Sequence, residues 1–96
     1  MNFMELLREF VGLYGPPQQE GPVREAFVTH AELLGFRPRI DAKGNALIGP
    51  ESPAVVVTAH LDEIALIVSE IRPDGGLKVV ELGGAYAWKW GEGPVE

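Results

Sequence analysis

The segment Thr58–Ile64 carries the residues best suited to chemistry. It reads Thr-Ala-His-Leu-Asp-Glu-Ile, so His60 and Asp62 stand two positions apart. In extended backbone, residues at this spacing project their side chains to the same side. A neutral imidazole can then bind a divalent cation through one nitrogen while a carboxylate accepts a hydrogen bond from the other. The spacing suits this arrangement or two direct metal ligands, and the plain alternative is a strand-end histidine bonded to a nearby carboxylate.

The residues before His60 indicate where the sheet would place it. Ala54–Ala59 is almost continuously apolar and rich in β-branched residues. Such a run is typical of a strand that is buried on both faces, at the centre of a sheet covered by helices. In open α/β sheets, ligands bind just outside the carboxyl ends of the strands. We therefore predict that His60 lies at the carboxyl end of a central, doubly buried strand.

Two helices are predicted ahead of this strand. Residues 2–14 place apolar side chains at helical spacing, and Asn2 with Glu5 forms a capping-box pattern. A second helix is predicted from Pro22 to Leu34, since Pro22 suits a first helical turn and Gly35 stops the helix. His30 lies beside the apolar stripe of this helix, and we interpret it as a boundary histidine rather than a ligand.

The rest of the chain has the short apolar runs of strands. Antiparallel pairs are predicted on either side of Lys43-Gly44 and of the turn Pro73–Gly76. The expected strands cover residues 37–42, 45–48, 64–71, 77–82 and 85–90. On the last of these, Trp88 and Trp90 would share one face. The predicted fold class is α/β, with two N-terminal helices packed on a mixed β-sheet.

Composition narrows the class of protein. The chain has 96 residues, enough for one domain or a piece of one, and about two-thirds of its surface could be buried in a folded state that exposes roughly 5,400 Å². The net charge of −6 argues against nucleic acid and anionic membranes as partners. The absence of cysteine leaves histidine and carboxylates as metal ligands. The sequence lacks a membrane-spanning run or a signal peptide, so we expect a cytoplasmic location.

The chain resembles the tetrahedral aminopeptidases, a family of dinuclear metallopeptidases that includes glutamyl aminopeptidases. The run Val55–Val68 looks like the first metal-binding strand of that family. Four further pieces resemble it in the same order, namely the first helix with Gly12–Gly15, then Glu20–Glu25, Asp41–Asn45 and Leu82–Gly84. Two positions depart from its pattern, because Ala65 stands where glycine is usual and residues 85–90 differ from the usual stretch after the Gly-Gly pair.

This resemblance implies a site, a domain arrangement and partners. His60 would be the first ligand of one metal ion, and Asp62 would orient His60 rather than bind metal. A complete site would hold two divalent ions, zinc or cobalt, with one ligand from this segment. Residues 1–84 would form the N-terminal part of a zinc-aminopeptidase-like catalytic domain. Residues 85–96 would begin a β-rich inserted dimerisation domain, apparently truncated. Peptides would be the substrates, and dimers would assemble to a dodecamer.

Two functions remain open at this point. The first is the N-terminal portion of a metal-dependent aminopeptidase that removes N-terminal residues from peptides with a metal-activated water. The family's other ligands and its general base would lie beyond position 96, so we expect the 96-residue chain alone to be inactive. The alternative is a non-catalytic truncated fragment or interaction module that binds other chains through strand edges and the Trp88/Trp90 face. Val95-Glu96 resumes a strand pattern, as expected of a polypeptide cut at the start of its next strand.

Overall fold

The computed structural model describes residues 1–84 and 86–94 of the chain. Three helices and four strands are assigned among these residues. In order they are α1 (Phe3–Val11), α2 (Gly21–Leu33), β1 (Arg39–Ile40), β2 (Ala46–Leu47), β3 (Ala65–Ile71), β4 (Leu77–Leu82) and α3 (Ala87–Trp90). The expected resumption of a strand at Val95-Glu96 lies outside the described residues, and so does Ala85, the first residue of the strand expected over 85–90.

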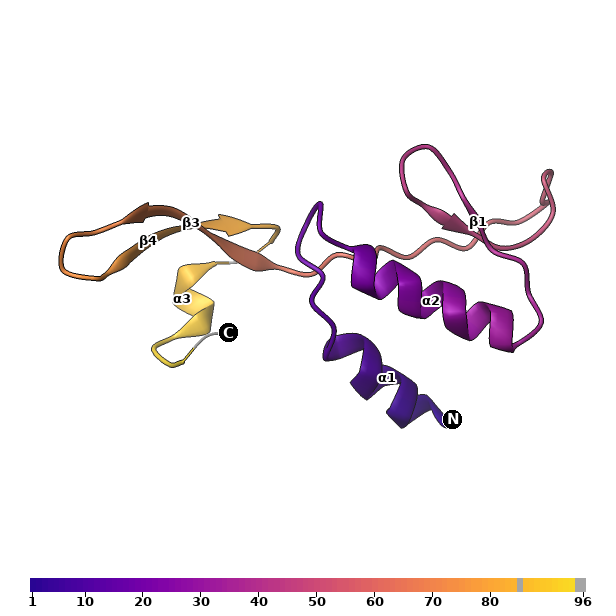
Figure 1. The fold of residues 1–96 in the computed structure, drawn as a ribbon, viewed down its shortest axis with the longest axis horizontal. Helices are drawn as coiled ribbons and strands as arrows, with labels where there is room; N and C mark the ends of the chain where they lie inside the picture. Colours follow the sequence, from indigo (N-terminus) through magenta and orange to yellow (C-terminus); the bar gives the residue numbers. More distant parts are fainter. Residues whose placement is uncertain (85, 95–96) are drawn as a thin grey trace.

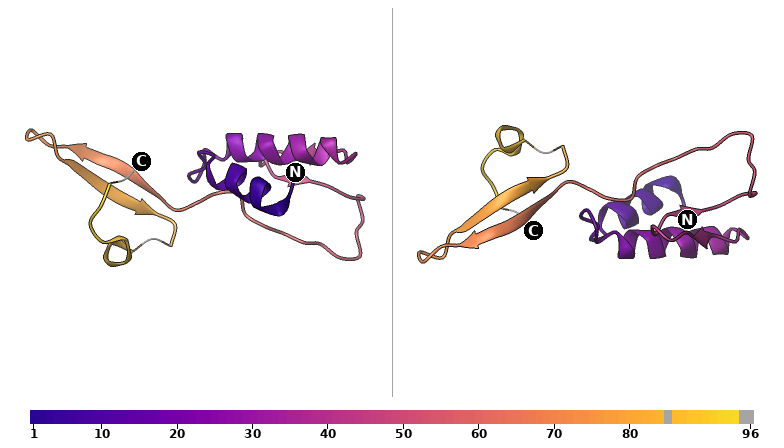
Figure 2. Two further views of the ribbon diagram at one scale, coloured as in Figure 1. Left: turned by 90° about the horizontal axis from the view of Figure 1, so that it is seen from below. Right: turned by 90° about the horizontal axis from the view of Figure 1, so that it is seen from above.

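The two N-terminal helices form where the sequence predicts them. Asn2 caps α1, accepting a hydrogen bond from the Glu5 backbone while the Glu5 side chain accepts one from the Asn2 backbone, so the predicted capping box is confirmed. Proline occupies the first turn of α2, where its missing N–H costs nothing. The helices lie side by side (Figures 1 and 2), and a hydrogen bond between the side chains of Glu9 and His30, at 3.0 Å, joins them. His30 thus occupies the boundary position expected of it.

The strands form two separate antiparallel pairs instead of one mixed sheet. β1 pairs with β2, and β3 pairs with β4 in a long hairpin whose register shifts between Val68 and Glu70. The predicted turn closes this hairpin, with Gly75 at φ +85° and the Gly76 backbone donating to the Asp74 carboxylate. The α/β class is therefore confirmed in its coarse form, as helices with small antiparallel sheets.

The prediction of a doubly buried strand at Ala54–Ala59 is wrong for this structure. Ala54 and Val55 form a bend, and the chain then runs past α2 towards the hairpin without any of these residues being assigned to a strand (Figure 1). Val55, Val56 and Val57 are 79%, 68% and 93% exposed. A buried strand needs hydrogen-bonded neighbours at both edges and a layer on each face. Within residues 1–84 and 86–94, no strand pairs with this segment. Its sequence therefore favours a buried strand, but the described residues supply no neighbouring strand.

The strand expected over residues 85–90 is also wrong in its described part. Residues 87–90 form the short helix α3 instead, ended by Gly91 at φ +65°. The Lys89 ammonium lies 5.0 Å from the Tyr86 ring centre and 5.2 Å from that of Trp88, a cation–π arrangement. Because helical residues two apart point to nearly opposite sides, Trp88 is 78% exposed while Trp90 is only 37% exposed. The two tryptophans therefore do not share a face.

The chain is elongated, with its buried residues at one end. It measures 54 × 30 × 21 Å, and its radius of gyration is 17.2 Å against about 12.5 Å for a compact domain of this length. Its exposed surface is 8276 Å², half as much again as the roughly 5,400 Å² expected from chain length. The buried residues among those described lie around the loop between α1 and α2 and along α2, namely Gly15, Pro16, Val23 and Ala31. The β3–β4 hairpin extends away from them (Figure 2).

None of the described helices is long and apolar enough to cross a membrane, and the longest, α2, has 13 residues.

Candidate functional site

His60 and Asp62 lie in the extended segment that leads from β2 to the hairpin. The backbone from Val56 to Asp62 passes along an open groove of about 950 Å³. Arg24 and Phe27 of α2 contribute to this groove, and so does the turn before β2, which Arg24 contacts through a hydrogen bond of 3.3 Å to the Gly44 carbonyl. His60 therefore lies at an accessible edge between the helices and the β1–β2 pair, and not at the end of a sheet strand.

The structure brings the side chains of His60 and Asp62 together. Nδ1 of His60 is 2.9 Å from Oδ1 of Asp62 and 2.8 Å from the Asp62 backbone carbonyl oxygen. Both oxygens are acceptors, so Nδ1 carries the hydrogen and donates it. In a neutral imidazole, Nε2 then keeps its lone pair. The His60 side chain is 85% exposed and that of Asp62 is 40% exposed.

This arrangement fits one metal ligand and its orienting carboxylate. Histidine ligands almost always donate their second N–H to a carboxylate or a backbone carbonyl, which fixes the tautomer and the ring orientation. Here both kinds of acceptor come from Asp62, and Nε2 is left as the nitrogen able to bind a cation. Asp62 is suited to orienting His60 because its Oδ1 is already engaged with the ring. The metal-binding role of His60 itself stays a prediction.

A complete metal site is not assembled by the described residues. Within residues 1–84 and 86–94, no group of three or more His, Asp or Glu side chains is close enough to hold a metal ion. Two-metal hydrolytic sites need several ligands in fixed geometry. The described residues therefore do not form a site of that kind, and the part that His60 and Asp62 would play in one stays a prediction.

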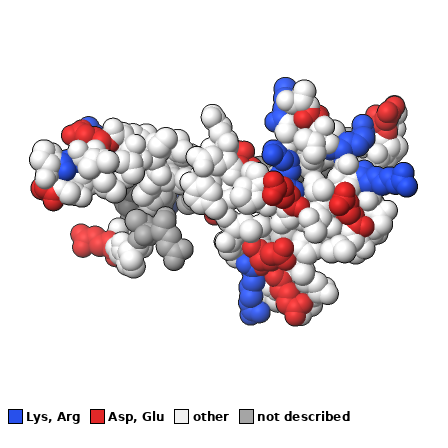
Figure 3. All heavy atoms as spheres, viewed as in Figure 1, with Lys and Arg blue, Asp and Glu red and all other residues white. Residues whose placement is uncertain are grey.

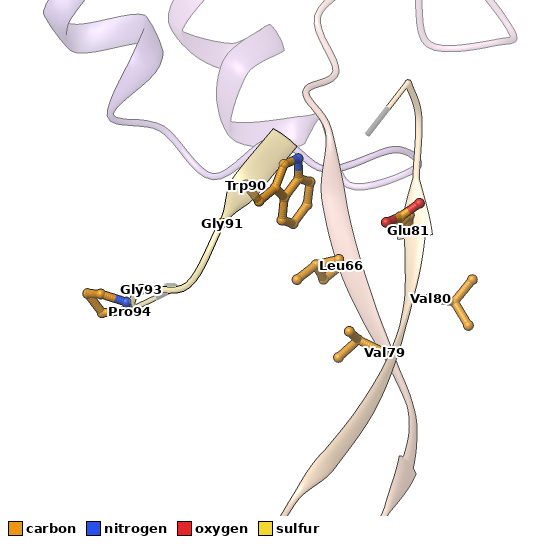
Figure 4. Close-up of a pocket in the computed structure, with 8 residues that line it drawn as sticks. All are labelled: Leu66, Val79, Val80, Glu81, Trp90, Gly91, Gly93 and Pro94. Atoms are coloured by element: carbon orange, nitrogen blue, oxygen red, sulfur yellow. The ribbon is translucent and has the colours of Figure 1, made fainter. Parts of the chain in front are cut away.

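A second cleft, of about 530 Å³, lies between the hairpin and α3 (Figure 4). Trp90 of α3 and Leu66 of β3 face the same space, with Val79 of β4 beyond them. Glu81 is the only ionisable residue among the described residues that line this cleft. A single carboxylate among apolar side chains offers no acid–base pair or ligand set, so we assign no chemistry to it.

The loop between α1 and α2 contributes a contact that sequence reasoning missed. The Glu63 backbone N–H donates to the carbonyl of Gly15 at 2.9 Å, which joins the His60–Asp62 segment to this loop. The sequence Gly15-Pro16-Pro17 indicates the end of a helix and says nothing of a partner 48 positions further on. The only local signal is a glycine followed by two prolines, which marks a constrained turn.

The turn between β1 and β2 contains a carboxyl group, that of Asp41, whose pKa is lowered. The Asp41 carboxylate accepts hydrogen bonds from the Asn45 side chain and from the Lys43 and Asn45 backbones, at 2.8 to 2.9 Å. The Asn45 side-chain bond, and after it the backbone bonds, hold the pKa of Asp41 below its ordinary value of 3.8. This carboxylate is fully engaged in closing the turn between β1 and β2, so we interpret it as structural.

Comparison with known proteins identifies the family. A sequence model of the M42 glutamyl aminopeptidases matches residues 44–96, more than half of the chain and the part that contains the candidate site. A glutamyl aminopeptidase of Lactococcus lactis is 39% identical over 70 residues, which is 68% of this chain and 20% of that protein. A lysyl aminopeptidase of Pyrococcus furiosus is 44% identical over 64 residues, covering 65% and 18%. A putative aminopeptidase of Acetivibrio thermocellus is 29% identical over 85 residues, covering 86% and 26%.

The chain thus spans only about a fifth to a quarter of the length of these curated relatives. The matched part is continuous from the turn before β2 to the last residue, and it includes both the His60–Asp62 pair and the hairpin. The chain belongs to the M42 glutamyl aminopeptidase family.

Proposed function

We propose that this chain is the N-terminal portion of a metal-dependent aminopeptidase that hydrolyses N-terminal residues of peptides. The observation that carries the proposal is the His60–Asp62 pair, with Nδ1 held by two Asp62 oxygens inside a segment that matches an aminopeptidase family. Residues 1–84 would belong to a zinc-aminopeptidase-like catalytic domain, and residues 85–96 would begin an inserted β-rich domain. The whole protein would act in the cytoplasm as a homo-oligomer.

In this proposal the chain's own residues hold and orient one ligand. His60 offers Nε2, because Asp62 accepts the hydrogen of Nδ1 with both its carboxylate and its backbone carbonyl. A pair of divalent ions, zinc or cobalt, would supply the activation of water and the polarisation of the peptide carbonyl when bound. The negative charge of Asp62 would raise the basicity of the imidazole towards the cation.

The test compares two histidine variants of the protein translated from the complete reading frame that contains residues 1–96, which we call the full-frame protein. We expect it to hydrolyse aminoacyl p-nitroanilides when zinc or cobalt is added. His60→Ala should lower activity at least a hundredfold and remove bound metal, measured by elemental analysis. His30→Gln is the matched control, since His30 is the only other histidine of the 96 residues and contacts Glu9 instead. Full activity and metal content in His60→Ala would contradict the proposal.

A non-catalytic interaction module is the second candidate function. The observation that favours it is the exposed apolar surface of the described residues, above all Val55–Val57 and the hairpin. A module of this kind would bind other polypeptides and show no hydrolysis in the full-frame protein, with or without metal. The activity assay above therefore separates the two candidates, because only the aminopeptidase proposal expects metal-dependent hydrolysis that is lost with His60.

A further inference from the structure

One peptide unit links the candidate site to the loop between the two helices. The peptide between Asp62 and Glu63 accepts a hydrogen bond from His60 Nδ1 at its carbonyl, at 2.8 Å. The same unit donates from its N–H to the Gly15 carbonyl, at 2.9 Å. Because a trans peptide is planar, its N–H and C=O point in opposite directions. The Gly15 bond therefore sets the direction of the carbonyl that receives His60.

Glycine is required at position 15 because there is no room for a side chain. A Cβ placed on Gly15 would lie 2.6 Å from Cγ2 of Val23 and 3.6 Å from the backbone oxygen of Leu61. Carbon atoms do not approach to 2.6 Å, so one of the two partners would have to move. Gly15 is buried, and Val23 is 7% exposed on α2. A β-branched side chain on a helix has one strongly preferred rotamer, so Val23 yields little.

The loop is the part that would move. A shift of Gly15 away from Val23 carries its carbonyl oxygen with it, and that oxygen is the acceptor for Glu63. The 62–63 peptide would then be free to rotate, and His60 would lose its hydrogen bond to the Asp62 backbone carbonyl. The second contact of His60 Nδ1, with Oδ1 of Asp62, would shift as well, because that carboxylate belongs to the same residue.

We propose that Gly15 is a positioning residue for His60, acting through the 62–63 peptide. Its close approach to Val23 places the carbonyl that orients Glu63, and this peptide in turn holds His60 in the tautomer with hydrogen on Nδ1. The part played in metal binding rests on the proposed function of His60. The positioning itself is a property of this chain without metal and can be tested as such.

The test uses four variants of the 96-residue chain, namely Gly15→Ala, Val23→Ala, the double variant, and Gly21→Ala. A Cβ placed on Gly21 would have no atom within 4 Å, so Gly21→Ala is the matched control for adding a methyl group near this loop. Two readouts are measured. Hydrogen exchange reports the Glu63 amide, and ring ¹⁵N–¹H correlation in histidine-labelled chain reports the His60 tautomer at about pH 8.5, where a free imidazole is neutral.

Gly15→Ala should speed exchange at Glu63 by about tenfold and lower the population of the Nδ1–H tautomer of His60. Val23→Ala removes the atom that the new methyl group would strike, so the double variant should regain both signals. Gly21→Ala should leave both as in the parent chain. If Gly15→Ala unfolds α2, the double variant decides the matter. An unchanged tautomer in Gly15→Ala, or a double variant that stays disrupted, overturns the proposal.

A third measurement separates this proposal from the proposed function. In the full-frame protein, Gly15→Ala should bind zinc more weakly than the parent protein. The double variant Gly15→Ala/Val23→Ala should bind zinc as tightly as Val23→Ala alone. If zinc affinity is unaffected by His60→Ala, the metal role of His60 fails, while the exchange and tautomer results still decide whether Gly15 positions it. If His60→Ala abolishes zinc binding and Gly15→Ala leaves it unchanged, the proposed function stands and the positioning role is overturned.

Discussion

Asp62 contacts Nδ1 of His60 with two oxygen atoms, its Oδ1 at 2.9 Å and its backbone carbonyl at 2.8 Å. Two acceptors on one ring nitrogen leave a single tautomer compatible with both contacts. They differ in charge, because only the carboxylate adds negative charge beside the imidazole. Substitution of Asp62 can therefore separate orientation from charge.

Asp62→Ala in the full-frame protein should lower zinc affinity by about ten- to a hundredfold, the range found for partners of metal-bound histidines. Asp62→Asn should lose less, since an amide oxygen can still accept from Nδ1 although the charge is gone. Competition with a chelator measures both. Asp74→Asn, in the hairpin turn, is a control for removing a carboxylate elsewhere, and a loss as large as that of Asp62→Ala would contradict the orienting role.

The 96-residue chain by itself should bind zinc weakly. Under the proposed function His60 would be the one nitrogen ligand from this segment, and the described residues form no group of three His, Asp or Glu side chains that could hold a metal ion. Titration calorimetry should show no tight one-to-one binding at neutral pH. Tight binding that disappears in His60→Ala would mean that a complete site forms within this chain and that its ligands have been misjudged.

The pair Glu9–His30 should hold α1 against α2. Nε2 of His30 is 3.0 Å from both carboxylate oxygens of Glu9, and its ring lies 5.9 Å from that of Phe10. The side chains are 20% and 38% exposed for His30 and Glu9, so we expect the pair to contribute about 0.5–1 kcal/mol. His30→Ala should speed amide exchange along α1 several-fold. Glu9→Gln should have a smaller effect, and equal exchange in all three chains would show that the pair does not hold α1.

The turn between β1 and β2 should loosen in acid. Hydrogen bonds from Asn45, first its side chain and then its backbone, lower the pKa of Asp41 from the ordinary 3.8. A carboxylate whose pKa is depressed on folding stabilises the fold fully above its unfolded pKa, near 3.8, and that contribution disappears as the pH falls through the lower folded value. Amide exchange and chemical shifts of Asn45 should change in that range. Asp41→Asn should remove the acid response, and a turn that stays unchanged throughout an acid titration below pH 3.8 would contradict the stabilising role of this carboxylate.

Sequence alone predicts the parts of this structure that depend on near neighbours. The capping box of Asn2 and Glu5 closes within one helical turn, and the hairpin around Gly75 closes within a few residues, so local chemistry decides both. The run Ala54–Ala59 is different, because a strand exists only when another strand pairs with it. The sequence shows its apolar character but not its partner.

The same difference between local and distant contacts applies to the candidate site. His60 and Asp62 are two residues apart, so their contact is local and a pattern search finds the pair. Gly15 reaches Glu63 across 48 positions of sequence, and the reason for glycine there is a contact with Val23 on another element. The sequence gives no sign of this close approach between Gly15 and Val23.

The 96-residue chain should associate with itself as its concentration rises. Figure 3 shows charged side chains gathered over the helical end and at the hairpin tip, with largely uncharged surface between them. Monomers rarely expose contiguous apolar patches above a few hundred Å², and a two-stranded hairpin offers unpaired edges on both sides. Of these edges, β3 carries no charge from Ala65 to Ser69, whereas β4 carries Lys78 and Glu81. We therefore expect association through β3 and through Val55–Val57.

Two lysine variants test this expectation by sedimentation over a range of concentrations. Val57 is 93% exposed and Ile67, in the middle of the uncharged part of β3, is 51% exposed, so neither substitution removes a buried side chain. Val57→Lys and Ile67→Lys should each shift the chain towards monomer, because a charge on an edge or apolar face opposes pairing with a second copy. Thr29→Lys, on the exposed side of α2, is the control and should leave association unchanged. A parent chain that sediments as a compact monomer, with strongly protected amides over residues 54–71, would show that this segment is satisfied within a single copy.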